Sequence, residues 1–204
     1  MSIHLFGIPV YKTALKEHKQ IQDDFKHVLN EDSHFNKIPT WYSNVDTTYG
    51  NPEANTLPFK NFIRSAIEGL NEYLETFDID SPLDYQIECW VNRYKEDHFQ
   101  EIHNHAGKSQ ISCAYMLKTP VDSGNFVFYN ETYDYFHQSG LPELSSKSFR
   151  YNNRVTPPLD EGDIIYFPSN VGHYVSNNKS NQIRATISAN FVLKRKLDNE
   201  EKHN

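Results

Sequence analysis

The second half of the chain is built from short runs rich in aromatic and β-branched residues, and this texture most constrains the fold. Such runs follow Pro82 at residues 85–94, 99–105, 110–118, 124–130, 163–168, 171–176 and 183–193. Turn-forming residues separate them, and no helical pattern lies between them. Many short strands at close spacing are typical of an antiparallel sandwich or barrel. We therefore predict a mainly β core over residues 85–193.

The segment before this core is partly helical. Apolar residues recur near helical spacing in 14–29, and they form a stronger apolar stripe in 58–77. A chain of 204 residues suits one domain. We expect residues 1–84 to be a supporting part of the same domain as the β core, and the charged residues 194–204 to form a frayed tail.

One long connection interrupts the predicted strands. Residues 131–161 are polar, hold no strand signal of comparable strength, and contain scattered aromatic residues. A connection of this length is often a lid or a binding loop, so we expect it to frame a pocket. Its composition indicates no particular class of substrate.

Composition and charge disfavour several classes of function. The net charge of −7 disfavours non-specific binding to nucleic acid, which requires a cationic face. No apolar run approaches the roughly 18 residues of a membrane span, and the N-terminus lacks the pattern of a signal peptide. Cys89 and Cys113 each lie in an apolar run, so we expect two buried thiols, no disulfide, and a reducing, cytoplasmic location.

Two histidines stand one residue apart just before an apolar run. His103 and His105 would share one face of an extended strand, with Cα atoms roughly 6.6 Å apart. Two imidazoles at that separation can converge on one metal ion. A bare His-x-His is more often a pair of polar residues on a solvated face, so its context must decide.

The context is a third histidine and an arginine further along the chain. His173 follows a Glu-Gly-Asp turn, a short apolar run and a Phe-Pro-Ser turn, and Arg184 lies eleven residues later. Arg184 would share one strand face with Thr186, Ser188 and Asn190. Burying an arginine is costly unless it pairs with an anion. That anion is either one of the 27 acidic side chains or a ligand carboxylate, which a guanidinium can bind bidentately.

This arrangement resembles the iron(II)/2-oxoglutarate-dependent oxygenases. Their signature is His-x-Asp/Glu, a distal His, and an Arg or Lys roughly ten residues beyond on a strand. The resemblance covers about residues 85–193. Small oxygenases of this superfamily share three further patterns, which here read Trp90-Val-Asn92, Ser112-Cys-Ala-Tyr115 and Phe167-Pro-Ser-Asn-Val-Gly-His173.

The resemblance implies a fold, a cofactor and a set of residues. The fold would be a double-stranded β-helix, or jelly roll, with N-terminal supporting α-helices. Fe(II) would be held by His103, His105 and His173. The cosubstrate 2-oxoglutarate would be bound by Arg184, with Thr186 or Tyr115 assisting and with Asn92 and Tyr94 nearby. The reaction would hydroxylate a substrate and release succinate and CO₂.

The second metal position departs from the family norm, which is two histidines and one carboxylate. Here that position is His105, and either the site is made of three histidines or a carboxylate joins it from elsewhere. Glu101 would lie roughly 13 Å from His105 along an extended strand, too far to share an ion. We therefore expect a three-histidine site, which leaves the ion its full charge and favours a dianionic ligand.

Two other functions stay open at this stage. A three-histidine cupin-type dioxygenase or isomerase would not use 2-oxoglutarate, and a jelly-roll binding protein would not catalyse a reaction. The substrate could be a small molecule or a protein side chain. The sequence is also consistent with a homodimer. We expect Trp41 and Trp90 in the core, and His98 in a loop outside the site.

Overall fold

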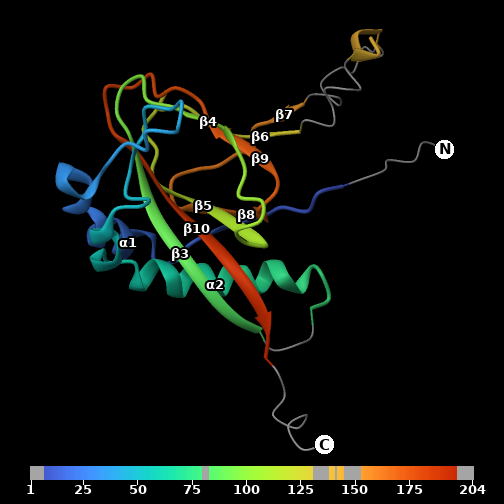
Figure 1. Cartoon of the computed structure of the whole chain (residues 1–204), viewed down its shortest axis with the longest axis horizontal. Helices are drawn as coiled ribbons and strands as arrows, with labels where there is room; N and C mark the ends of the chain where they lie inside the picture. Colours follow the sequence, from blue (N-terminus) through green and yellow to red (C-terminus); the bar gives the residue numbers. More distant parts are fainter. Residues whose placement is uncertain (1–6, 80–82, 131–137, 141, 145–152, 197–204) are drawn as a thin grey trace, which may run out of the picture.

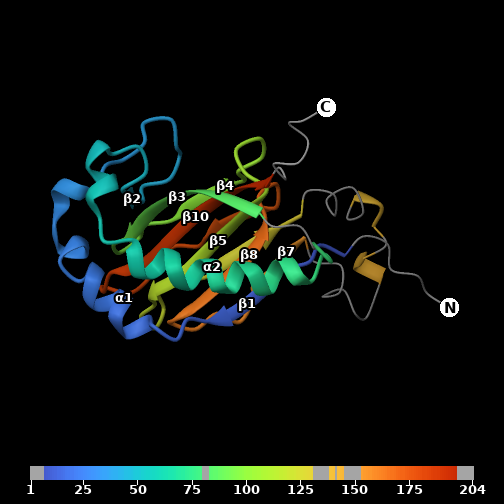
Figure 2. The same ribbon diagram turned by 90° about the horizontal axis from the view of Figure 1, so that it is seen from below.

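The computed structural model describes residues 7–79, 83–130, 138–140, 142–144 and 153–196. Two antiparallel sheets lie face to face, and two helices cover the outer face of the larger sheet (Figures 1 and 2). This is the jelly roll that the sequence predicts, with helices that come from the N-terminal part of the chain.

The larger sheet has six strands. Their spatial order is β1 (Tyr11–Ala14), β8 (Asp163–Pro168), β5 (Ile111–Lys118), β10 (Arg184–Arg195), β3 (Leu83–Tyr94) and β2 (Asp46–Thr47). The smaller sheet has the order β4 (Gln100–His103), β9 (Gly172–Val175), β6 (Phe126–Tyr129) and β7 (Arg154–Val155). Neighbouring strands in both sheets are antiparallel. Because β3, β5, β8 and β10 belong to the larger sheet and β4, β6, β7 and β9 to the smaller one, the chain crosses repeatedly between the two sheets.

The two helices share a core with the outer face of the six-stranded sheet. They are α1 (His18–Phe25) and α2 (Lys60–Glu75), and short 3₁₀ turns cover Val28–Asn30, Asp32–His34, Pro52–Thr56 and Pro142–Leu144. Phe25 and Phe62 from the helices pack in one cluster with Ile187 and Phe191 from β10. Removal of this apolar surface from water is what holds the helices to the sheet.

One glycine allows the long helix to approach the sheet closely. A Cβ atom at Gly69 would lie 2.6 Å from the phenol oxygen of Tyr166, which donates a hydrogen bond of 2.8 Å to the Ala66 carbonyl. A larger side chain at position 69 would push α2 away from β8.

A second, smaller core lies between the two sheets. It consists of Val45, Tyr94, Ala114, Met116, Phe126, Ile165, Phe167 and Val175. Several of these residues also line a cavity, so this inner core supplies the apolar part of the cavity wall.

Each of the seven predicted strand ranges contains a strand, and both predicted helical ranges contain a helix. The sequence did not indicate β1 or β7, which are four and two residues long. β4 ends at His103, so His105 lies just beyond the strand instead of within it. Most of the predicted 131–161 loop, and residues 197–204 of the tail, lie outside the described residues.

Cys89 and Cys113 are free thiols, although only Cys113 is fully buried. None of the helices in the described part of the chain is long and apolar enough to cross a membrane.

Candidate metal centre and its cavity

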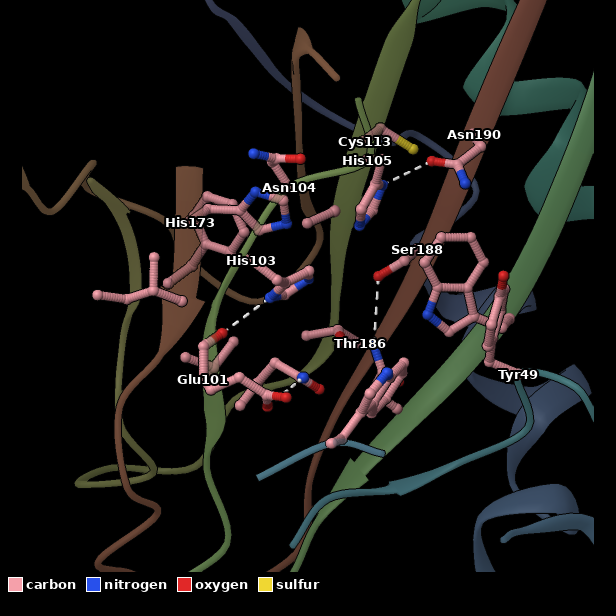
Figure 3. A pocket seen from close by; sticks show the side chains of 18 of the residues that line it. Tyr49, Glu101, His103, Asn104, His105, Cys113, His173, Thr186, Ser188 and Asn190 are labelled. Carbon is pink, nitrogen blue, oxygen red and sulfur yellow. Dashed lines mark hydrogen bonds between the residues drawn. The ribbon is translucent and has the colours of Figure 1, made fainter. Parts of the chain in front are cut away.

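Three histidines meet between the two sheets. His103 in β4 pairs across the sheet with His173 in β9, and His105 follows the end of β4. The potential ligand nitrogens of the three rings all lie within 4.8 Å of one another (Figure 3). Ring centroids are separated by 4.4 Å for His103 and His173, and by 5.2–5.3 Å for the pairs that include His105. The structure therefore brings the predicted triad together.

Hydrogen bonds fix two of these rings in one tautomer. The Nδ1 atom of His103 lies 2.8 Å from the Glu101 carbonyl oxygen, and that of His173 lies 2.9 Å from the Val171 carbonyl oxygen. Because a carbonyl oxygen only accepts, each Nδ1 must carry the proton. The Nε2 lone pair of each ring is then free to bind a metal ion.

His105 is held differently, by side chains. Its Nδ1 atom lies 2.7 Å from Oδ1 of Asn190 and 3.0 Å from Oγ of Ser112. Its backbone N–H donates to the Ser169 carbonyl oxygen at 2.7 Å, which anchors the turn after β4. This clamp on His105 joins residues far apart in the sequence and was not predicted as part of the site.

The surroundings keep all three imidazoles neutral. Burial lowers the pKa of His103 and brings that of His105 to about 4, and it holds the pKa of His173 well below its usual range. The neighbouring histidines lower the pKa of His105 and His173 further. Neutral imidazole is the form that coordinates metal, so the site is ready to bind an ion near pH 7.

No carboxylate joins the triad in the part of the chain that the structure describes. Glu101 lines the cavity, but its carboxylate accepts hydrogen bonds from Gln100 Nε2 at 2.7 Å and from the Tyr42 backbone N–H at 3.2 Å. His98 lies outside the group, as expected. The donor set of three neutral nitrogens fits a divalent transition-metal ion.

The triad opens onto a cavity of about 350 Å³. Its inner wall comes from β3 and β10 and includes Asn92, Tyr94, Thr186, Ser188 and Asn190. Asn92 accepts a hydrogen bond of 2.8 Å from Thr47 Oγ1, and burial raises the pKa of Tyr94 to about 12. Three of the residues predicted to contact a cosubstrate (Asn92, Tyr94 and Thr186) therefore line the same cavity as the triad.

Aromatic rings form another wall of the cavity. Trp90 lies 5.6 Å from the His105 ring and 5.3 Å from Tyr49, which stacks on Trp41 at 6.0 Å between centroids. Tyr42 stands next to them and is 92 % exposed. As expected, Trp90 is buried in the core and Trp41 packs against the inner core, and both residues also line this cavity.

Arg184 is not among the residues that line this cavity. It is 2 % exposed and donates to the Gly124 carbonyl oxygen, but its Nε has no partner. No carboxylate of the described residues pairs with it. Arg184 lines a second cavity of about 550 Å³, and Phe126 borders both cavities. Its guanidinium carbon is 5.9 Å from the centroid of the Tyr94 ring.

The Arg184 guanidinium contacts the Gly124 carbonyl oxygen and Met116 Sδ, but no carboxylate of the described residues neutralises its charge. Such a charge is costly in a folded protein, and an anionic ligand would offset that cost. The unpartnered Nε of Arg184 therefore fits a carboxylate-binding role.

The prediction for Tyr115 is wrong. Its side chain is fully buried in the cluster beneath the helices, and its hydroxyl lies 2.5 Å from Nδ1 of His18. Because side chains alternate along β5, the cavity side of the strand belongs to Ser112, Ala114 and Met116. Tyr115 therefore points away from the cavity and cannot contact a cosubstrate there.

Comparisons with known proteins agree with this geometry. A family model described as "Putative 2OG-Fe(II) oxygenase" matches residues 88–190. A search of the curated proteins gave no match.

Solved structures share the fold at low sequence identity. A prolyl-4-hydroxylase from Pseudomonas putida superposes with a TM-score of 0.58 at 12 % identity, covering 93 % of this chain and 94 % of that one. The epimerase SnoN from nogalamycin biosynthesis gives 0.60 at 16 %, covering 91 % and 78 %. HygX from Streptomyces hygroscopicus, with nickel and 2-oxoglutarate bound, gives 0.57 at 12 %, covering 91 % and 83 %.

Proposed function

Because the chain belongs to the 2OG-Fe(II) oxygenase family, we propose that it uses O₂ to hydroxylate an organic substrate, with conversion of 2-oxoglutarate to succinate and CO₂. The observation that carries this proposal is the convergence of three neutral imidazoles, within 4.8 Å, on a cavity. The family uses Fe(II) and 2-oxoglutarate.

His103, His105 and His173 are the proposed ligands of Fe(II). Their Nδ1 atoms are engaged in hydrogen bonds, so the rings are already oriented before an ion arrives. When bound, Fe(II) and 2-oxoglutarate supply the oxidative chemistry, while the protein supplies orientation and exclusion of water. Three neutral ligands leave the ion with its full double positive charge, which suits a cosubstrate with two negative charges.

Arg184 is the proposed anchor for the far carboxylate of 2-oxoglutarate. Its buried guanidinium lies beside Tyr94, which lines the metal cavity together with Thr186. Support for this role comes from the absence of a carboxylate partner among the described residues and from the unpartnered Nε. Thr186 and Asn92 would bind along the cosubstrate between the arginine and the metal ion.

The aromatic wall is the proposed platform for the substrate. Trp41, Tyr42 and Tyr49 offer flat apolar faces, and a single cation, Lys108, lies among the cavity residues, 3.1 Å from the Tyr49 hydroxyl. Such a surface favours an uncharged ring or alkyl segment over a phosphorylated one. A small metabolite and a protein side chain both meet this description.

Anaerobic titration tests the metal and cosubstrate assignments together. Addition of Fe(II) and then 2-oxoglutarate to the protein should produce the visible charge-transfer band of the chelate. His173→Ala should weaken metal binding more than about a hundredfold and abolish the band. His98→Ala is the matched control, because His98 lies outside the triad, and it should retain the band. A band that survives His173→Ala would refute the assigned ligands.

Exposure of the loaded protein to O₂ then tests the reaction. Succinate should form, and a substrate from a metabolite or peptide library should gain one oxygen atom from ¹⁸O₂. Metal binding without succinate would contradict the use of 2-oxoglutarate. A product that loses hydrogen or changes stereochemistry without gaining oxygen would contradict hydroxylation and retain the family assignment.

A further inference from the structure

We infer that Glu88 and Asn190 are positioning residues that select the metal-binding tautomer of His105. The inference rests on the proposed function only in taking His105 as a metal ligand. It concerns the position at which the oxygenase signature has a carboxylate and this chain has an imidazole.

The residues behind His105 form a row across three adjacent strands. Asn190 in β10 is in register with Glu88 in β3 on one side and with Ser112 in β5 on the other. Asn190 Nδ2 lies 3.1 Å from Glu88 Oε2, and Asn190 Oδ1 lies 2.7 Å from His105 Nδ1. Figure 3 shows the contact between Asn190 and His105. The row thus runs from an exposed carboxylate to a ring of the triad.

The direction of these hydrogen bonds follows from Glu88. An ionised carboxylate only accepts, so the amide of Asn190 must present its NH₂ group to Glu88 and its oxygen to His105. That oxygen only accepts, so the proton of the His105 ring must sit on Nδ1. Ser112 Oγ donates to the same oxygen at 2.9 Å, which reinforces this orientation. Nε2 of His105 is left with a free lone pair.

The other two ligands need no such device. His103 and His173 are held by backbone carbonyl oxygens, which cannot exchange a donor for an acceptor. The amide of Asn190 can turn over and present its NH₂ group to the ring. His105 is therefore the one histidine of the triad whose tautomer depends on side-chain partners, and the nearer of them, Asn190, is oriented by Glu88.

The variant Glu88→Lys should reverse the orientation of the Asn190 amide. A lysine only donates, so the Asn190 oxygen should turn toward it and the NH₂ group should turn toward His105. Nδ1 must then accept, and the ring proton moves to Nε2, where the metal ion would bind. In metal-free protein, long-range ¹H–¹⁵N NMR should show His105 changing from the Nδ1–H to the Nε2–H tautomer. The dissociation constant for Co²⁺, measured anaerobically, should rise about 10- to 100-fold.

Two further variants separate the effect on the tautomer from a general effect of added positive charge and from loss of folded structure. Asp84→Lys makes the same change of charge at an exposed position of the same strand, and it should change Co²⁺ affinity less than about threefold. The double variant Glu88→Lys/Asn190→Asp should restore the Nδ1–H tautomer and the affinity, because an aspartate can accept from both the lysine and the ring. Loss of structure would not be rescued in this way.

These measurements distinguish failure of the positioning role from failure of the metal site. An unchanged tautomer in Glu88→Lys, or an equal loss of affinity in Asp84→Lys, overturns the positioning role. If the unaltered protein binds no Co²⁺, the metal site fails, while the NMR measurement on metal-free protein still decides whether Glu88 sets the tautomer.

Discussion

The two faces of the six-stranded sheet are equally buried but chemically opposite. In β10, Ile187 faces the helices and is 0 % exposed, while its neighbour Thr186 faces the cavity and is 3 % exposed. The helix side is lined by apolar side chains, whereas the cavity side combines the apolar inner core with buried polar side chains and Arg184. Burial alone therefore does not distinguish the structural face from the functional one.

The two faces differ in the kind of contact that their buried side chains make. The helix side is satisfied by apolar contact with α1 and α2. On the cavity side most polar groups bond to one another, as Asn190 does with Ser112 and His105, but Nε of Arg184 does not. Such an unpartnered donor is compatible with a bound ligand or an ordered water that completes its hydrogen bond.

Truncation on the helix side should give the largest loss of stability. Ile187→Ala removes buried methyl groups from the larger core, and it should lower the free energy of unfolding by about 2–5 kcal/mol. Chemical denaturation measures the loss, and the folded fraction should bind Co²⁺ as tightly as before. A loss below about 1 kcal/mol would mean that this face is less tightly packed than the structure shows.

Replacement of the buried arginine should reverse this relationship between stability and binding. Arg184→Met removes the proposed anchor and should weaken 2-oxoglutarate binding about 10- to 100-fold, as expected for loss of charge-assisted hydrogen bonds. Without cosubstrate, the variant should be at least as stable as the parent, because an uncompensated buried charge is gone.

Arg64→Met, at an exposed position of α2, is the control for this variant. It should affect neither cosubstrate binding nor stability. Calorimetric titration and thermal melts measure both quantities. Unchanged 2-oxoglutarate affinity in Arg184→Met would exclude Arg184 as the anchor.

Acidification should destabilise the metal-free protein through the cavity side. The pKa values of the three histidines are lowered by burial, so the unfolded chain binds more protons below pH 6.5. Stability is therefore complete above that pH and declines as pH falls toward 4, by up to about 1.4 kcal/mol per pH unit for each histidine. His105→Gln should flatten the dependence of melting temperature on pH. Parallel curves for variant and parent would contradict the assignment.

Removal of a hydroxyl from one tyrosine on each face of the sheet should give the smallest effects on stability and cosubstrate binding. Tyr115→Phe removes a hydroxyl that bonds to His18 on the helix side. It should cost about 0.5–1.5 kcal/mol of stability and leave cosubstrate affinity unchanged. Tyr94→Phe, on the cavity side, should weaken 2-oxoglutarate binding instead. Equal effects of the two variants on cosubstrate binding would remove the distinction between the faces.

Features encoded by local patterns were predicted well. The strands that contain His173 and Arg184 have strong β signals between clear turns, and α2 has an apolar stripe over its whole length. The shared order of the histidines and the arginine indicated the family, which the match over residues 88–190 confirms. The assignment of individual site residues stays a prediction.

Features that depend on long-range contacts were not accessible from the pattern. β5 is apolar on both faces, so alternation could not show which face Tyr115 occupies. The clamp on His105 joins it to Asn190, 85 residues away, and no local signal marks such a pair. β7 is a two-residue strand whose existence depends on its pairing with β6.

The aromatic wall has a practical consequence. The chain contains only two tryptophans, and both line the cavity beside the triad. Fluorescence that is excited selectively in tryptophan therefore originates at the place where metal ion, cosubstrate and substrate would enter. Quenching by a paramagnetic ion, and a spectral shift on addition of an organic compound, would let large compound collections be screened for the missing substrate without a label.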